Sequence, residues 1–123
     1  MSQSAFEIYI TEAFVTENSV VYTVKKFIRK NDDCVLEENW LNQNGKYHRL
    51  DEPAIIQYNY YGIRSRERYY YQGQAHNISG PALIEYFEHE ISYVEYFILG
   101  KYIDKKDYLQ EARKYKFQEL KLY

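Results

Sequence analysis

The most distinctive run of chemistry-bearing residues is Arg64-Ser-Arg66-Glu-Arg68, which three consecutive tyrosines follow. Alternate side chains of a β-strand share one face, so the three arginines and Tyr70 are predicted to project together. Guanidinium groups among aromatic rings can bind phosphates and stack on bases, and the same combination is enriched in protein interfaces. A third interpretation is a solvated sheet face on which the arginines lie over tyrosine rings and pair with acidic side chains.

The charge is distributed unevenly along the chain. The formal net charge is −2, but residues 1–24 and 69–100 contain acidic residues and neither lysine nor arginine. In the second stretch, we expect three acidic residues to take part in binding together with the arginines: Glu85, Glu88 and Glu95. A protein that binds duplex nucleic acid normally presents a strongly basic face, which this balance does not favour. We therefore expect a protein partner, and nucleic-acid or nucleotide binding through Arg64, Arg66 and Arg68 is the alternative.

Residues that could catalyse a reaction are few. The sequence has no Gly-x-Ser-x-Gly elbow, phosphate-binding loop or dinucleotide fingerprint. Its paired carboxylates, such as Asp32-Asp33, would point to opposite faces of a strand. His48 and His76 could approach a metal together with Asp51, but the simpler expectation is that each ring fills a bend, bonded to the backbone or stacked on an aromatic ring. We expect no enzyme activity, no cofactor and no metal.

An internal repeat organises the second half of the chain. Six pairs of identical residues lie 28 positions apart without a gap. They are Gly45 and Gly73, His48 and His76, Pro53 and Pro81, Ala54 and Ala82, Ile56 and Ile84, and Tyr58 and Tyr86. A third, truncated copy begins at Tyr96, and its Gly100 lies 27 residues after Gly73. Six matches at one spacing indicate a structural repeat.

Each repeat unit is predicted to be a β-hairpin. Aromatic or apolar residues, which form strands well, precede every repeat glycine. The glycines Gly45, Gly73 and Gly100 tolerate the positive φ of a tight turn. The histidine then marks a bend, and Pro53 or Pro81 starts the next strand, where its missing N–H matters least.

These units resemble the MORN-type variant repeat of phage, giant-virus and bacterial proteins. The resemblance lies in the string Asn-Gly-Lys-x-His-Arg-x-Asp-x-Pro-Ala at residues 44–54 and covers about residues 38–103. This chain departs from the pattern at Glu52, where the family has glycine, and at Asn77 and Ser79, which replace arginine and aspartate. The resemblance implies an antiparallel ribbon of stacked hairpins and says little about activity, because such repeats are scaffolds.

The remaining segments complete a single domain of 123 residues. Alternating and β-branched residues predict N-terminal strands within residues 1–37, with turns at 17–19 and 30–33. Residues 104–123 contain neither glycine nor proline, and Leu109, Ala112, Lys116 and Leu120 recur at helical spacing. The predicted fold is mainly β, an antiparallel meander of repeated hairpins with one C-terminal helix as its cap.

Composition supports a recognition protein. Tyrosine occurs 16 times, tryptophan once, and tyrosine suits half-exposed recognition surfaces. With one cysteine, Cys34, no signal peptide and no membrane span, we expect a cytoplasmic protein. The favoured hypothesis is a non-catalytic protein-binding module, such as a viral accessory protein that inhibits a host defence (an anti-CRISPR, for example) from within the host cytoplasm. An antitoxin or immunity-type protein is an alternative, and exposed edge strands leave homodimerisation open.

Overall fold

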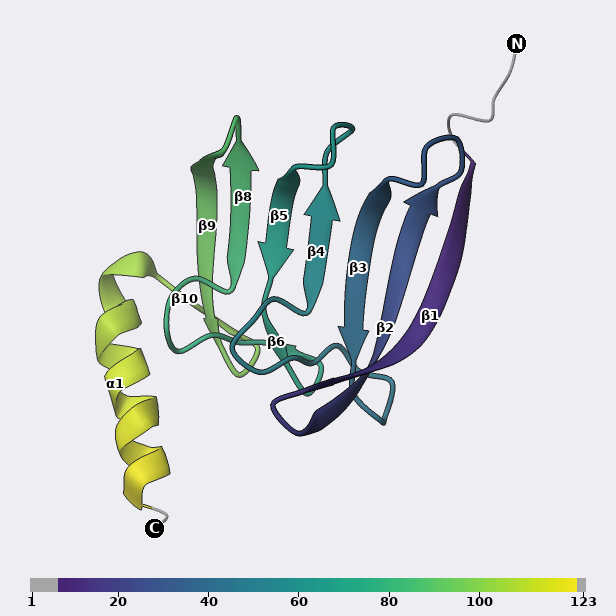
Figure 1. The fold of residues 1–123 in the computed structure, drawn as a ribbon. Coiled ribbons are helices and arrows are strands. Elements are labelled where there is room, and N and C mark those ends of the chain that lie inside the picture. Colours follow the sequence, from purple (N-terminus) through teal and green to yellow (C-terminus); the bar gives the residue numbers. More distant parts are fainter. Residues whose placement is uncertain (1–6, 122–123) are drawn as a thin grey trace.

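The fold is an eight-stranded antiparallel sheet with one helix at its end, as the computed structural model shows for residues 7–121 (Figure 1). The strand order is β1-β2-β3-β4-β5-β8-β9-β10, and β6 and β7 form a separate small hairpin. The elements are β1 (Ile8–Glu17), β2 (Val20–Arg29), β3 (Val35–Leu41), β4 (Ile55–Tyr58), β5 (Arg64–Arg68), β6 (Tyr70–Tyr71), β7 (Gln74–Ala75), β8 (Leu83–Phe87), β9 (Glu90–Ile98), β10 (Lys101–Ile103) and α1 (Lys105–Lys121). The predicted meander of hairpins with a C-terminal helix is confirmed.

The N-terminal strands form one long, regular hairpin. β1 and β2 pair residue by residue from Ile8↔Arg29 to Glu17↔Val20. Asn18 and Ser19 make the two-residue turn, with φ of 51° and 67°, which is the left-handed conformation that twisted hairpins favour. Residues 1–6, with which the predicted N-terminal region begins, lie outside the described residues.

The two repeat units are structurally equivalent at their histidine bends. The Nδ1 atom of His48 accepts a hydrogen bond from the Gln72 amide at 2.9 Å, and that of His76 accepts one from the Leu99 amide at 2.8 Å. Gln72 and Leu99 precede the repeat glycines and share a left-handed φ, 47° and 48°. The histidine of each unit therefore fixes the Gly turn that follows it, and the two histidines have equivalent surroundings, as the repeat predicts.

The substituted repeat position keeps its hydrogen bond. Arg49 Nη1 donates to the carbonyl of Pro53 at 3.2 Å, and Asn77 Nδ2 donates to the carbonyl of Pro81 at 2.9 Å. The two proline bends are thus closed in the same way by different side chains. The departure of Asn77 from the repeat pattern changes the donor and preserves the geometry.

Two tyrosines from outside the repeats complete the bends at either end of the array. The Tyr22 hydroxyl of β2 accepts the Leu50 amide at 3.0 Å, and its ring packs edge-on against Trp40. The Tyr108 hydroxyl of α1 accepts the Gly80 amide at 3.0 Å and donates to the Asn77 carbonyl. These tyrosines satisfy backbone groups that the partly buried bends would otherwise leave unpaired.

The helix covers the last strands, which confirms its predicted role. Ile103, Tyr108 and Ala112 form a buried cluster, and Tyr96 and Ile98 of β9 pack against it. In Figure 1 α1 lies at the β10 end of the sheet, opposite β1. The side chain of Leu120 lies outside the described residues. Among the residues that are described, no helix has the length and apolarity needed to cross a membrane.

Candidate protein-binding surface

The predicted arginine strip is divided between the two faces of the sheet. The pairing of β4 with β5 shifts between Gln57 and Tyr58, so that Gln57 faces Arg66 whereas Tyr58 faces Arg64. Such a bulge moves the following side chains to the opposite face. Arg64 accordingly lies on the face of Glu67, and Arg66 on the other face with Gln57. The prediction that all three arginines share one face with Tyr70 is wrong, because alternation cannot show a bulge.

Arg66 belongs to a ladder of polar side chains across neighbouring strands. Gln57 Nε2 donates to Glu37 at 3.0 Å, and Arg66 Nη1 donates to Gln57 Oε1 at 3.5 Å. Arg66 Nη2 completes the ladder with an ion pair to Glu85 at 2.9 Å. The predicted pairing of the arginines with the acidic stretch is confirmed here, and the Arg66 guanidinium is already engaged within the chain.

Arg64 belongs to a second network, on the opposite face. Its Nη1 atom lies 2.8 Å from Glu67 Oε2, and the Glu67 side chain is only 8% exposed. The Tyr86 hydroxyl donates to the other oxygen of the same carboxylate at 2.9 Å. Burial, together with this bond to the Glu67 carboxylate, raises the pKa of Tyr86 to about 12. Arg64 and Tyr86 therefore stabilise the nearly buried Glu67 carboxylate within the sheet.

Replacing Arg64 by alanine is expected to cost more stability than replacing Arg66. Arg64→Ala removes a charged partner from a nearly buried carboxylate, which costs about 1–3 kcal/mol. Arg66→Ala breaks a half-exposed ion pair and should cost less than about 1 kcal/mol. Urea unfolding of the two variants measures the difference. Equal losses would show that Glu67 finds water in place of Arg64.

Three of the other residues expected to bind a partner lie together, because Arg68, Tyr70 and Glu95 line one pocket of about 170 Å³. Tyr70 belongs to the small β6–β7 hairpin and packs against the buried cluster around Tyr22 and Trp40. Arg68, Leu83 and Glu95 follow one another across β5, β8 and β9 on one face. Glu88 is exposed in the turn between β8 and β9. The structure therefore brings Arg68, Tyr70 and Glu95 together, beside the Arg66–Glu85 ion pair on the same face, and leaves Arg64 and Glu88 apart from them.

The two repeat histidines are neutral supports, as the simpler expectation had it. Each Nδ1 atom accepts a backbone amide, and ring contacts link His48 to Tyr71 at 5.1 Å and His76 to Tyr71 and Tyr115. Burial lowers the pKa of His48 and of His76, an effect that Glu119 partly opposes at His76. Among the described residues, no three His, Cys, Asp or Glu side chains are grouped to hold a metal.

These lowered pKa values predict that stability falls as the solution becomes acidic. Below about pH 6.5, the ordinary pKa of histidine, these histidines bind protons in the unfolded chain more readily than in the folded protein. The free energy of unfolding should therefore decline from pH 7.5 to 5.5, and His48→Gln should flatten the decline. His89→Gln, at a histidine exposed in a turn outside the two bends, is the matched control for the change of side chain. An unaltered slope in His48→Gln would contradict the assignment.

A groove of about 640 Å³ separates the two histidine bends. It is lined by the consecutive tyrosines Tyr69–Tyr71, by residues of the two bends and by residues of α1. Of these tyrosines, Tyr70 was predicted to flank the arginines, and it lines a second pocket with Arg68 as well as this groove.

The most exposed aromatic pair of the described chain was not among the predicted site residues. Tyr60 and Tyr61 lie in the turn between β4 and β5, and they are 64% and 81% exposed. Their rings meet edge to face, 5.3 Å apart. Figure 1 shows that this turn, the β2–β3 turn and the β8–β9 turn lie at one end of the sheet. We call residues 30–34, 59–62 and 87–91 the hairpin rim.

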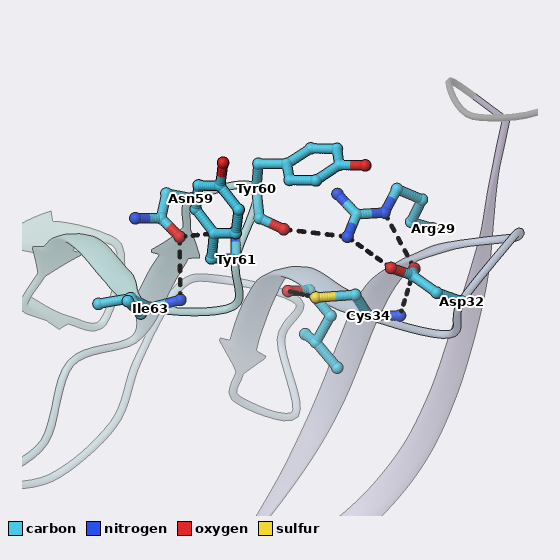
Figure 2. Close-up of polar contacts among 8 residues, drawn as sticks. Arg29, Asp32, Cys34, Asn59, Tyr60, Tyr61 and Ile63 are labelled. Carbon is cyan, nitrogen blue, oxygen red and sulfur yellow. Dashed lines mark hydrogen bonds and ion pairs between the residues drawn. The ribbon is translucent and has the colours of Figure 1, made fainter.

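The turn that carries this pair is fixed by hydrogen bonds (Figure 2). Asn59 Oδ1 accepts the amides of Tyr61 and Ile63 at 2.9 and 3.1 Å. The Gly62 amide donates to the Asn59 carbonyl, and Gly62 has a φ of 82°. An asparagine side chain that bonds the backbone two residues on stabilises such a turn. The two rings are therefore exposed on an ordered backbone.

Arg29 supports the same turn from the neighbouring hairpin. It is 5% exposed, holds Asp32 through two hydrogen bonds of 2.9 and 2.7 Å, and donates to the Tyr60 carbonyl at 3.0 Å. Its guanidinium lies 4.1 Å from the centre of the Tyr60 ring. Asp32 Oδ1 also accepts the Cys34 amide, so the β2–β3 and β4–β5 turns form one connected unit (Figure 2).

The sequence did contain a signal for this site. The first repeat's turn uses Asn42, whose side chain accepts the amides of Asn44 and Lys46. The string Asn59-Tyr-Tyr-Gly62 has the same asparagine and glycine, three positions apart. Comparison of the two turns would have placed Tyr60 and Tyr61 at a hairpin tip. The contact of Tyr60 with Arg29, which lies 31 residues away, could not be inferred.

No family model matches the chain, and comparisons with curated proteins and with solved structures give no match either.

Proposed function

We propose that this protein is a non-catalytic binding module whose hairpin rim docks onto a partner protein. The observation that carries the proposal is the exposed but rigid pair Tyr60 and Tyr61. Tyrosine offers a large contact area for little conformational entropy, and it is enriched among the residues that dominate binding energy. A turn already ordered by Asn59 and Arg29 would lose little further entropy on binding.

The rest of the rim indicates the chemistry of the partner. Phe87 and Ile91 are 68% and 60% exposed at the same end of the sheet. Exposed acidic side chains there outnumber the one exposed base, Lys30; they are those of Asp32, which pairs with Arg29, and of Asp33, Glu88 and Glu90. Charged groups across an interface are arranged to complement one another. The proposed partner therefore has an apolar pocket for Tyr60 and Tyr61, bordered by basic side chains.

Differential capture tests this function. Immobilised wild-type protein, a Tyr60→Ser/Tyr61→Ser variant and a Tyr102→Ser variant are exposed to the same bacterial lysate. Tyr102 is 55% exposed on β10, away from the rim, so it serves as the matched control. A protein retained in stoichiometric amount by the wild type and the control, but not by the rim variant, is the expected result. Equal retention by all three, or retention by none, would contradict the proposal.

Nucleic-acid binding receives less support from the same geometry. Arg64 and Arg66 are engaged with Glu67 and Glu85 on opposite faces, which leaves no continuous basic strip. Steep salt dependence of oligonucleotide binding would favour that alternative. Inhibition of a host target by a phage protein, and membership of the MORN-type repeats, stay proposals. The equivalent bends support the second, and an activity assay of the captured partner tests the first.

A further inference from the structure

Among residues 7–121, the outer edge of β1 presents a long row of backbone groups that no other strand pairs. β1 is the first strand of the sheet, and β2 is its neighbour in the sheet. Its ten residues pair with β2 without a bulge or shift. Figure 1 shows β1 at the margin of the sheet, far from α1. Within residues 7–121, no strand covers its other side.

The register shows which residues point outward. The two-residue turn at Asn18–Ser19 makes Glu17↔Val20 a hydrogen-bonded pair, and such pairs alternate along antiparallel strands. Odd-numbered residues of β1 therefore bond to β2, and even-numbered residues direct their N–H and C=O groups away from it. The outward residues are Ile8, Ile10, Glu12, Phe14 and Thr16.

Apart from the charges of Glu12 and Glu17, this edge lacks the features by which proteins usually protect an edge strand. β1 contains no proline, lysine or arginine, and these residues, bulges and short length are the usual means of protection. Its outward residues Ile8, Ile10 and Phe14 are instead 46%, 57% and 82% exposed. The opposite edge, β10, has three residues and leads into α1. The two edges thus differ in a way that favours strand addition at β1.

The charges on β1 indicate what kind of strand fits. Its charged residues are Glu12 and Glu17, and Glu17 is held by Arg49 at 2.9 Å. On the inner side, β2 places Lys25 opposite Glu12, between Thr23 and Phe27, which face Phe14 and Ile10. A second copy would bring another acidic strand. Opposite charges stabilise cross-strand pairs and like charges destabilise them.

We propose that β1 accepts an extended segment of a partner protein as an additional antiparallel strand, with a basic residue opposite Glu12 and apolar residues on either side. Backbone hydrogen bonds supply affinity in this mode of recognition, and alternate side chains supply specificity. The inference adds a second contact to the proposed function, but it uses a separate surface. Loss of one contact leaves the other intact.

Hydrogen exchange of individual amides tests this inference. The probe is an end-capped synthetic peptide with the sequence of residues 21–28, and a peptide with glutamate at both lysine positions is its control. In the free protein the Ile10, Glu12 and Phe14 amides should exchange rapidly, whereas those of Thr11 and Ala13 are protected. The probe should slow the outward amides at least tenfold, and the control peptide should not.

Variants of β1 separate the edge from the rim. Glu12→Pro removes one outward N–H at a position where an edge strand tolerates proline, and Glu12→Gln keeps that N–H. Protection by the probe should be lost in the first and weakened in the second. Phe14→Lys adds a charge to the edge without changing the backbone, and protection by the probe should be lost in this variant too. It replaces Glu12→Pro as the test if that substitution unfolds β1. The Tyr60→Ser/Tyr61→Ser variant should bind the probe as the wild type does.

Three results would overturn the inference. The first is an absence of protection by the probe, and the second is equal protection by both peptides. The third is that the outward amides of the free protein already exchange slowly, and that their protection grows with protein concentration as the molecular mass doubles. That last result would assign the edge to a second copy of this chain.

Discussion

Replacing Tyr22 by alanine is expected to lower the free energy of unfolding by about 3–5 kcal/mol, as for other large aromatic residues in cores. Tyr22 is 1% exposed and packs edge-on against Trp40 at 5.4 Å. The substitution leaves a cavity in the cluster that joins the N-terminal hairpin to the first repeat, and it also removes the acceptor of the Leu50 amide. Equilibrium unfolding in urea, followed by tryptophan fluorescence of Trp40, measures the loss.

Two matched variants divide this effect into its parts. Tyr22→Phe keeps the ring and removes the hydroxyl, which should cost about 1–3 kcal/mol because a partly buried amide loses its partner. Tyr102→Ala truncates a tyrosine that is 55% exposed and should change stability little. If Tyr22→Ala costs no more than Tyr102→Ala, the cluster around Trp40 does not hold the hairpin to the repeats.

Replacing Tyr60 and Tyr61 together by serine is expected to weaken binding to the captured partner roughly 30- to 1000-fold, the effect of losing 2–4 kcal/mol at the centre of an interface. Both rings are largely exposed in the free protein, so their removal should leave the fold intact. Titration calorimetry or surface plasmon resonance with the purified partner measures the affinity, and thermal unfolding confirms the unchanged fold.

The control for this loss removes the support and keeps the rings. Asn59→Ala deletes the acceptor of the Tyr61 and Ile63 amides but leaves both tyrosines in place. It should weaken binding less than the double variant does, because it increases only the conformational entropy that the turn loses on binding. An affinity unchanged by the loss of both rings would remove the hairpin rim from the interface.

The repeat was the part of the fold that could be predicted in most detail. Gly45, Gly73 and Gly100 all occupy positive φ, as the turns required. His48 and His76 fill equivalent bends because each must accept the amide of the turn that follows. These features depend on residues close in the chain or one unit apart, so identity at a fixed spacing was enough to find them.

The binding surface was predicted less well, for two physical reasons. A bulge at Ser65 moves Arg64 away from Arg66, and alternation along one strand carries no information about extra residues in a ladder. The support of Tyr60 by Arg29 joins residues 31 positions apart. Such a contact depends on how two hairpins lie side by side, and this arrangement cannot be predicted from the sequence of either hairpin alone.

The sequence by itself determined a mainly β fold with repeated hairpins, their turn positions and a terminal helix, since alternation, glycine placement and helical spacing are local properties of the chain. Only the tertiary structure decided which side chains remain available to a partner. It pairs Arg64 with Glu67 and Arg66 with Glu85. It places the hydroxyl groups of Tyr22 and Tyr108 in the bends, and it leaves Tyr60, Tyr61 and the edge of β1 exposed. The reason is that exposure depends on neighbours brought together by strand order and register, which are long-range properties.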